Sequence, residues 1–542
     1  MMLLNLILHL TAVVSDPSAV WPKPAEISAG NQVAPLSSQF KFTTSYGAPD
    51  GLKKMMDRYQ KQMLASKWTP MVPTYEAKGI KAVWELKTVL VKVNSQEHSL
   101  SESTDESYSL TIKGSTGTIK AETIYGARHA METLYQMVQS SNGQRVISKV
   151  PLTINDKPKF KHRGLLLDTS RNYYPVEDIM RTITTMGRNK MNVFHWHIVD
   201  SHSWPFQSKK HPKLSQKGAI FPEQIYTFED IQEIVKFGMT HGVRVIPELE
   251  APAHSYAIGL AYPEVSTCMD MDKWGDFAAE PPSGQIDPTN PKSIKIVKDL
   301  MDEFVELFPD SRLHLSGDEV NQKCWDEDEN IQKYVKENDI DSKSLLDGFA
   351  KKMHDHAKEK KRSILVWEEM VLNHNVSLPK DTLVQIWNQA EKVKEIIEKG
   401  YGVVLSSVEN WYLDCGRGGW IGNNPEGNSW CDPFKSWQRV YSLNLHKGLD
   451  SKQKEMVAGG EVALWSEQAD SANLDILLWP RSSAAAEVLW TGTEVDSNQT
   501  VIIPQDALAR LNNFRFHLLH HKVNAEPLQP LWCVRHPGRC NL

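Results

Sequence analysis

Two carboxylates stand side by side at Asp318 and Glu319, directly after an apolar run that contains Leu313 and Leu315. Adjacent carboxylates repel each other, so a chain keeps them together either in solvent or where the repulsion shifts a pKa for chemistry. The leucines before the pair favour the end of a buried strand. A helix cap or a solvated loop is the alternative that this segment alone leaves open.

Short hydrophobic runs of this kind recur along the chain, and helical patterns separate several of them. The runs occupy residues 164–170, 191–200, 243–250, 312–319, 364–368, 383–387, 403–406 and 461–467. Amphipathic stretches with helical spacing occupy residues 176–186, 228–241, 291–308 and 344–360. Eight strands that alternate with helices predict an α/β fold, a (β/α)8 TIM barrel, whose chemistry lies at the C-terminal ends of the strands.

The chain before residue 159 has a different pattern. Residues 1–18 are apolar and then turn polar, which predicts a secretory signal peptide, with a buried N-terminal helix as the alternative. Strand-like runs at 81–93, 107–112, 118–122 and 146–154, with a helical pattern at 127–137, predict a small α+β accessory domain with one packing helix. We therefore expect this domain over 19–158 and the catalytic domain, with a C-terminal extension, over 159–542.

The composition excludes some partners and predicts the compartment. A net charge of −6 and a pI near 6.4 give no reason to expect nucleic acid or an anionic membrane as partner. Six cysteines without a CxxC pattern predict three disulfides in an exported chain, rather than a metal site. Two glycosylation sequons, at Asn375 and Asn498, are consistent with a secreted protein. The cysteines are Cys268, Cys324, Cys415, Cys431, Cys533 and Cys540.

The predicted strand ends collect carboxylates, one arginine, histidines and aromatic residues. Indoles stack on the C–H faces of sugar rings, and carboxylates and arginine bind hydroxyls. One protonated carboxylic acid can donate to a leaving oxygen, so the set indicates glycoside chemistry. For each tryptophan, ordinary core packing is the alternative. The residues are Asp168, Arg171, His197, Asp200, Glu250, His254, Asp318, Glu319, Trp367, Trp387, Trp411, Tyr412, Asp414, Trp465 and Glu467.

The adjacency of the carboxylates restricts the mechanism. The side chains of neighbouring residues on one strand point to opposite sides of the sheet. Such a pair is poorly placed to act as acid and nucleophile on opposite faces of one sugar. We therefore expect Glu319 to donate the proton and Asp318 to hold a group of the substrate. A 2-acetamido group can itself act as the nucleophile, a known exception to the two-carboxylate scheme.

Five segments carry a resemblance to a known family. Residues 163–171, 194–200, 247–254, 314–320 and 464–467 resemble the motifs of glycoside hydrolase family 20 β-N-acetylhexosaminidases, over about residues 160 to 492. The segments 411–415 and 459–490 look closest to secreted fungal members, and the N-terminal domain is similar to the family's accessory domain. Ser201 stands where many members have a second aspartate, and Glu250 stands where aspartate is common.

The resemblance implies a secreted, exo-acting, retaining enzyme that removes terminal GlcNAc or GalNAc from chitooligosaccharides or glycans through an oxazolinium intermediate. It implies no cofactor, a homodimer, and the disulfides Cys268–Cys324 and Cys533–Cys540, which leaves Cys415–Cys431. By position, the implied roles are Glu319 as general acid/base, Asp318 and Tyr412 on the acetamido group, Trp367, Trp387 and Trp465 as pocket walls, Arg171, Asp414 and Glu467 on hydroxyls, and Asp200 and His254 as a hydrogen-bonded chain to Glu319.

Two other classes of protein remain as alternatives. His195 and His197 form an H-x-H pattern at a strand end, which supplies two ligands in metal-dependent barrel hydrolases. Packing or hydrogen bonding is the ordinary role for both histidines, and further ligands are not clear from the sequence. A sugar-binding protein on a decayed barrel is the third class, but it requires loss of Asp318 or Glu319, and both are present.

Overall fold

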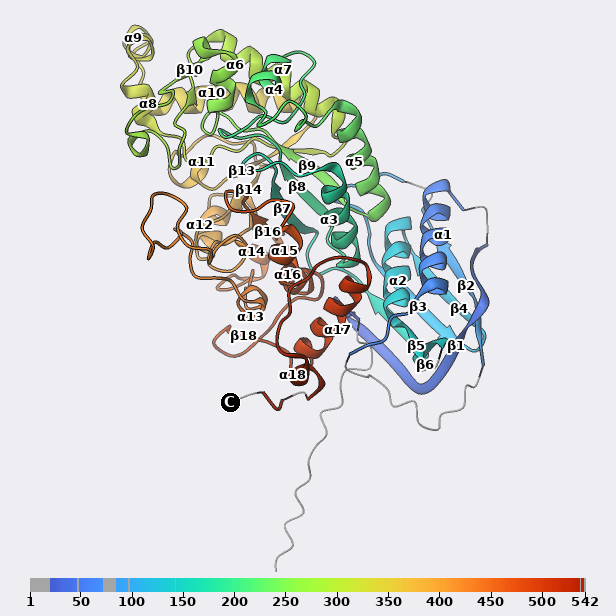
Figure 1. Ribbon diagram of the computed structural model, residues 1–542. Coiled ribbons are helices and arrows are strands. Elements are labelled where there is room, and N and C mark those ends of the chain that lie inside the picture. Colours follow the sequence, from blue (N-terminus) through green and yellow to red (C-terminus); the bar gives the residue numbers. More distant parts are fainter. Residues whose placement is uncertain are drawn as a thin grey trace, which may run out of the picture.

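The computed structural model describes residues 20–45, 48–71, 84–95, 98–141, 143–536 and 538–540. The predicted signal peptide therefore lies outside the described residues. A small α+β unit precedes a barrel, and the two lie side by side in Figure 1, with the small unit in blue and cyan. Among the described residues, no helix is both long and apolar enough to cross a membrane.

The barrel confirms the predicted fold class. Eight parallel strands close in the order β12-β13-β14-β15-β16-β7-β8-β9. Inside the barrel, Val193, Ile246, Leu365 and Val404 come from four of these strands and form one buried apolar layer. The strands are β7 (His162–Asp168), β8 (Val193–His197), β9 (Arg244–Glu248), β12 (Arg312–His314), β13 (Ser363–Trp367), β14 (Leu383–Ile386), β15 (Gly402–Leu405) and β16 (Val457–Leu464).

Helices pack around the barrel, and local sequence signals set their ends. Helix α5 begins with a capping box between Thr227 and Asp230 and ends at Gly242, whose φ of 73° suits glycine. The four helices expected from periodicity are α3 (Val176–Arg188), α5 (Phe228–His241), α7 (Pro291–Leu307) and α10 (Ser342–Glu359). The others are α4 (Lys213–Gly218), α6 (Tyr256–Ala261), α8 (Gln322–Asp326), α9 (Glu329–Glu337), α11 (Glu369–Leu372), α12 (Lys392–Glu398), α13 (Trp437–Tyr441), α14 (Ser451–Glu455), α15 (Leu474–Leu478), α16 (Arg481–Thr491), α17 (Ala507–His520) and α18 (Leu531–Arg535).

Several short elements lie in the loops. Two 3₁₀ turns occur at η1 (Pro263–Val265) and η2 (Trp274–Asp276). Two small antiparallel sheets are formed by β10 (Ser266–Thr267) with β11 (Gln285–Ile286), and by β17 (Glu494–Val495) with β18 (Val501–Ile502).

The N-terminal unit has a six-stranded sheet in the order β1-β2-β4-β3-β6-β5, with β1 also paired to β6. Two helices cover it, so the expectation of one helix is wrong. The missed helix α1 buries Leu52, Met55, Met56, Tyr59 and Met63 at helical spacing, but polar side chains dominate its remaining positions. The elements are β1 (Glu26–Thr44), α1 (Asp50–Ala65), β2 (Leu86–Val93), β3 (Tyr108–Lys113), β4 (Thr116–Ala121), α2 (Ile124–Met137), β5 (Val138–Ser141) and β6 (Gln144–Asp156).

Buried ion pairs join the small unit to the barrel. Lys190, two residues after the end of α3, contacts Asp156 at 2.8 Å, and both side chains are 0% exposed. Arg163 on β7 contacts Glu106 of the small unit at 2.6 Å. A buried charge that loses its partner is strongly destabilising, so the two units depend on each other for stability.

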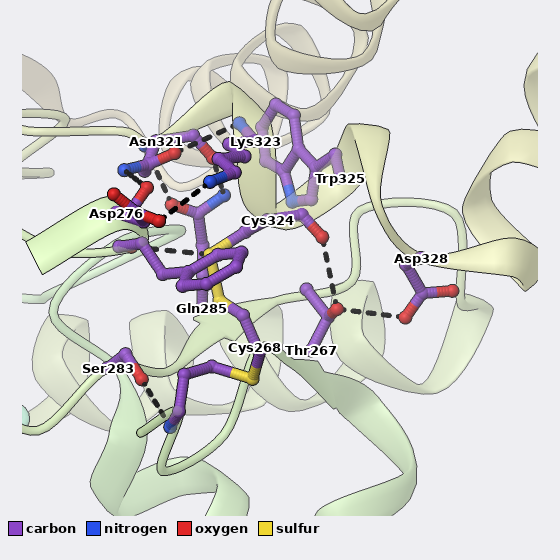
Figure 2. The surroundings of a disulfide bond; sticks show 12 residues. Thr267, Cys268, Asp276, Ser283, Gln285, Asn321, Lys323, Cys324, Trp325 and Asp328 are labelled. Atoms are coloured by element: carbon purple, nitrogen blue, oxygen red, sulfur yellow. Dashed lines mark hydrogen bonds and ion pairs between the residues drawn. A yellow bond between two sulfur atoms is a disulfide. The ribbon is translucent and has the colours of Figure 1, made fainter. Parts of the chain in front are cut away.

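Three disulfides form, with the pairs that the family resemblance implied. They are Cys268–Cys324, Cys415–Cys431 and Cys533–Cys540. Figure 2 shows the first, which links the loop after β10 to α8. Around it, Asn321 and Gln285 exchange two hydrogen bonds of 2.9 and 3.1 Å, so β11 is held against the loop that follows barrel strand β12.

Candidate active site

A cavity of about 420 Å³ opens beside the C-terminal ends of the barrel strands. It gathers side chains that are far apart in sequence, as parallel strands that end at one rim must do. All but one of the predicted catalytic and binding residues line it, and the exception, Asp200, lies fully buried behind Arg171. The lining includes Arg171, His254, Glu280, Asp318, Glu319, Trp367, Trp387, Tyr412, Asp414, Trp465 and Glu467.

Asp318 and Glu319 reach this cavity together from a loop. Strand β12 ends at His314, so the expectation that the pair alternates across a strand is wrong. The backbone turns instead, with φ values of 47°, 95° and 51° at Ser316, Gly317 and Glu319. A Cβ at Gly317 would lie 2.6 Å from the side chain of Met370, so space also favours glycine there. The turn presents both carboxylates to the same pocket.

A hydrogen-bonded chain runs from Glu319 into the protein. His254 Nε2 lies 3.1 Å from Glu319 Oε2 and 3.8 Å from Asp318 Oδ2. On the other side of the ring, Nδ1 lies 3.4 Å from Asp200 Oδ1. Burial lowers the pKa of His254, but the Asp200 and Asp318 charges and the Glu319 contact outweigh it and hold this pKa well above its usual value. His254 is therefore an imidazolium that links Asp200 to Glu319.

Arg171 forms one end of the cavity. Its Nη1 contacts Asp200 at 2.8 Å, and its other nitrogens bind Glu280. The guanidinium carbon lies 5.2 Å from the centre of the Trp465 ring. Glu280 was not predicted from the sequence, because it comes from the loop between β10 and β11 rather than from the end of a barrel strand.

Two carboxyl groups of the cavity, Asp414 and Glu467, have raised pKa values, and Glu467 lies close enough to Arg171 to feel its charge. Burial, as the largest cause, raises the pKa of Asp414 to about 7 and that of Glu467 to about 8. Among the described residues, Asp414 Oδ1 is buried without a hydrogen-bond partner. A bound ligand with hydroxyl groups would supply such a partner.

Aromatic rings form the walls. Trp465 lies 6.1 Å from Trp367 and 6.2 Å from Tyr412, between ring centres. The indole of Trp367 is fixed by a 2.7 Å hydrogen bond from Nε1 to Glu248. Trp387 is fixed in the same way by Glu369, at 2.8 Å. The orientations of the Trp367 and Trp387 rings are therefore fixed.

Two aromatic residues differ from expectation. Trp411, one of the aromatic residues at the predicted strand ends, is 0% exposed and donates to the Val440 carbonyl, so it packs in the core. Trp430, not predicted, is 65% exposed at the mouth of the cavity and lies 5.5 Å from Trp387. Its position next to Cys431, in a loop closed by a disulfide, is the only sequence signal for it.

The histidines of the H-x-H pattern bind carboxylates. His195 lies 3.0 Å from Glu461 and 3.2 Å from Glu248. His197 lies 2.5 Å from Glu248 and 2.9 Å from Asp200. Both rings are buried, and these contacts correspond to the hydrogen-bonding alternative for the pattern.

Comparison with known proteins identifies the family. Residues 160–493 match the model for the glycosyl hydrolase family 20 catalytic domain, and residues 20–137 match a second model described as beta-acetyl hexosaminidase like. This chain belongs to glycosyl hydrolase family 20. It is therefore a glycoside hydrolase.

Relatives of this glycoside hydrolase span almost its whole length. It is 35% identical over 546 residues to a chitooligosaccharidolytic beta-N-acetylglucosaminidase from Ostrinia furnacalis, covering 96% of this chain and 89% of the relative. It is 31% identical over 592 residues to a beta-hexosaminidase from Emericella nidulans, covering 98% and 97%. The X-ray structure of a Flavobacterium johnsoniae chitobiase superposes with a TM-score of 0.77 at 27% identity, covering 93% of this chain and 73% of that one.

Proposed function

We propose that this hydrolase is a secreted, exo-acting, retaining β-N-acetylhexosaminidase that removes terminal β-GlcNAc or β-GalNAc by substrate-assisted catalysis. The observation that carries the proposal is the placement of Asp318 and Glu319 in one loop at one pocket, bridged by His254. Because both carboxylates come from one loop and lie near the same His254 nitrogen, they do not flank a glycosidic bond from opposite sides as an acid and a nucleophile must. They suit a substrate that brings its own nucleophile.

In the proposed first step, Glu319 protonates the glycosidic oxygen as the acetamido oxygen attacks the anomeric carbon. Asp318 accepts a hydrogen bond from the acetamido N–H and stabilises the positive charge of the oxazolinium. Tyr412 donates its hydroxyl to the acetamido oxygen, and burial raises the pKa of this phenol well above its usual value, so it remains a donor. Glu319 then removes a proton from water, which attacks the anomeric carbon from the face that the leaving group vacated. Two inversions at one carbon give net retention.

The rest of the pocket accounts for action at a terminal sugar. Arg171, Asp414 and Glu467 bind hydroxyls at the closed end, which leaves no room for a chain to continue there. Trp367, Trp387 and Trp465 enclose the ring and the acetamido methyl. Asp200 and His254 hold Glu319 in position and support its proton transfer.

Further observations support the proposed biological setting. The name of the insect relative, chitooligosaccharidolytic, supports chitooligosaccharides as substrates. Three disulfides and exposed sequon asparagines at Asn375 and Asn498 support secretion and glycosylation. Dimer formation, which the family resemblance implies, is tested by light scattering of the purified protein.

The central test compares aryl β-N-acetylglucosaminide with aryl β-glucoside, which lacks the acetamido group. We expect cleavage of the first alone, and Glu319→Gln should lower kcat by about 10²–10⁴. The matched control is Asp310→Asn, which removes a buried partner of Arg244 at the N-terminal ends of the strands, away from the pocket. Full activity of Glu319→Gln, or equal cleavage of the glucoside, contradicts the proposal.

A further inference from the structure

The hydroxyl of Ser316 lies between two carboxyl groups. Its Oγ is 2.5 Å from Glu250 Oε2 and 2.7 Å from Asp318 Oδ1. Both distances are in the range of hydrogen bonds between oxygens. Ser316 is 0% exposed and Glu250 is 1% exposed. The three side chains thus form a continuous line from the interior to the pocket.

The number of hydrogens determines what this line contains. A serine hydroxyl has one hydrogen to donate, and an ionised carboxylate has none. Two short contacts between Ser316 and two carboxylates therefore require a second hydrogen. That hydrogen belongs to one of the carboxyl groups, which is then a protonated acid.

The surroundings identify Glu250 as that acid. Among the described residues, its Oε1 is buried without a hydrogen-bond partner. His197 Nδ1 is 3.6 Å away, but this nitrogen makes its short contact of 2.5 Å with Glu248. The ionisable groups that act on Glu250 are the anions Asp318 and Glu248, which raise its pKa, and His197 and His254, which lower it. Burial, then the Asp318 charge, raises the pKa of Glu250 well above its usual value.

Asp318 is better placed to carry the charge. Its side chain is 15% exposed, and it lies 3.8 Å from the His254 imidazolium. An ionised Asp318 accepts the single hydrogen of Ser316. Glu250 then donates its own hydrogen to Ser316 Oγ, and both contacts are satisfied.

The backbone of Ser316 provides a second observation. Its φ is 47°, a conformation that glycine adopts without strain and serine only at a cost. A hydroxyl between two carboxyls gives a physical reason for serine at this position.

We propose that Glu250 and Ser316 are positioning residues that form a proton-ordered relay, in which the Glu250 acid donates to Ser316 and Ser316 donates to Asp318. This rests on the proposed role of Asp318. The relay holds Oδ1 of Asp318 and leaves Oδ2 to accept the acetamido N–H of the substrate. It also keeps the two neighbouring carboxyls from being charged together.

The relay has a consequence for pH dependence. Burial is the largest of the causes that raise the pKa of Asp318 to about 6, and the Ser316 hydrogen bond opposes this rise. Without that hydrogen bond the pKa rises further, so the carboxylate is lost at a higher pH. In a plot of kcat against pH, the low-pH side, or acid limb, then moves to higher pH.

The test uses Ser316→Gly, which suits the positive φ and removes only the hydroxymethyl group. We expect the acid limb of its kcat profile to move to higher pH by about one unit. At a pH on this limb, its kcat should be about tenfold lower than that of the wild type. Ser208→Ala is the control, because it removes another buried serine, 2.5 Å from Glu303, outside the pocket. An unmoved acid limb in Ser316→Gly overturns the relay.

A second variant tests whether Glu250 is the donor in its hydrogen bond with Ser316. In Glu250→Gln the amide N–H replaces the acid O–H, so we expect the acid limb to stay in place. If Glu250 were ionised, this variant would remove a negative charge beside Asp318, and the limb would move to lower pH. Infrared spectra of the ligand-free protein should also lose one protonated-carboxyl band in Glu250→Gln, and absence of that band from the wild type overturns the assignment. The spectra require no turnover, so they separate failure of the relay from failure of the proposed function.

Discussion

Asp200 lies between Arg171, which we propose binds substrate, and His254, which contacts the proposed acid Glu319. It lies 2.8 Å from Arg171, 2.9 Å from His197 and 3.4 Å from His254. Asp200→Asn keeps the shape of the side chain and removes the charge. We expect the variant to fold, to bind substrate more weakly through the loosened Arg171, and to change the pH dependence of kcat.

The separation between Asp200 and His254 gives the size of that change. At an effective dielectric constant of about 20, opposite charges 3.4 Å apart attract by about 5 kcal/mol, or roughly 3 to 4 pKa units. Arg171 and His197 share the Asp200 charge, so we expect about half of this shift, roughly 2 units. Because burial remains after the charge is lost, the pKa of His254 falls. The imidazolium then persists only at lower pH.

The assay is kcat against pH with an aryl β-N-acetylglucosaminide. The alkaline limb should move to lower pH by about 2 units in Asp200→Asn, because the His254 proton is lost earlier. In Asp310→Asn, which breaks the buried pair with Arg244, the limb should stay in place. If kcat of Asp200→Asn fell by the same factor at every pH and the alkaline limb did not move, the proposed role of the Asp200–His254–Glu319 chain would be refuted.

Two further predictions concern stability and the pocket mouth. Asp156→Ala leaves the Lys190 ammonium buried without its partner, so the free energy of unfolding in urea should fall by about 3 to 5 kcal/mol; a loss below about 1 kcal/mol contradicts mutual support of the two units. Trp430→Ala should raise KM for a chitooligosaccharide by about threefold to tenfold, because the exposed indole can stack on a second sugar, while leaving KM for an aryl monosaccharide substrate almost unchanged. Equal effects on both substrates would place Trp430 against the terminal sugar instead.

The barrel could be predicted from the sequence because its signals are local. Helix α5 has regular spacing, a capping box and a terminal glycine, and its predicted limits match the structure. Strand β12 was predicted too long, because the apolar residues up to Leu315 do not show that the backbone turns at Ser316. That turn determines the direction in which the carboxylates of Asp318 and Glu319 point.

Residues on long loops could not be predicted in the same way. Glu280 and Trp430 line the cavity from loops that carry a disulfide, and no hydrophobic periodicity indicates the path of such a loop. The role we infer for Glu250 likewise depends on a contact with Ser316 across two strand ends, which only the structure shows. Tertiary packing, rather than residue type, determines these positions.

The attack of the substrate's own amide on the anomeric carbon is the central claim, and successive fluorination of the acetamido methyl tests it most directly. Fluorine withdraws electrons from the amide oxygen, so kcat/KM for aryl 2-acetamido, fluoroacetamido, difluoroacetamido and trifluoroacetamido glycosides should fall steeply along the series. Rates that do not change with fluorination would contradict the account, since a nucleophile supplied by the protein would then be doing the chemistry.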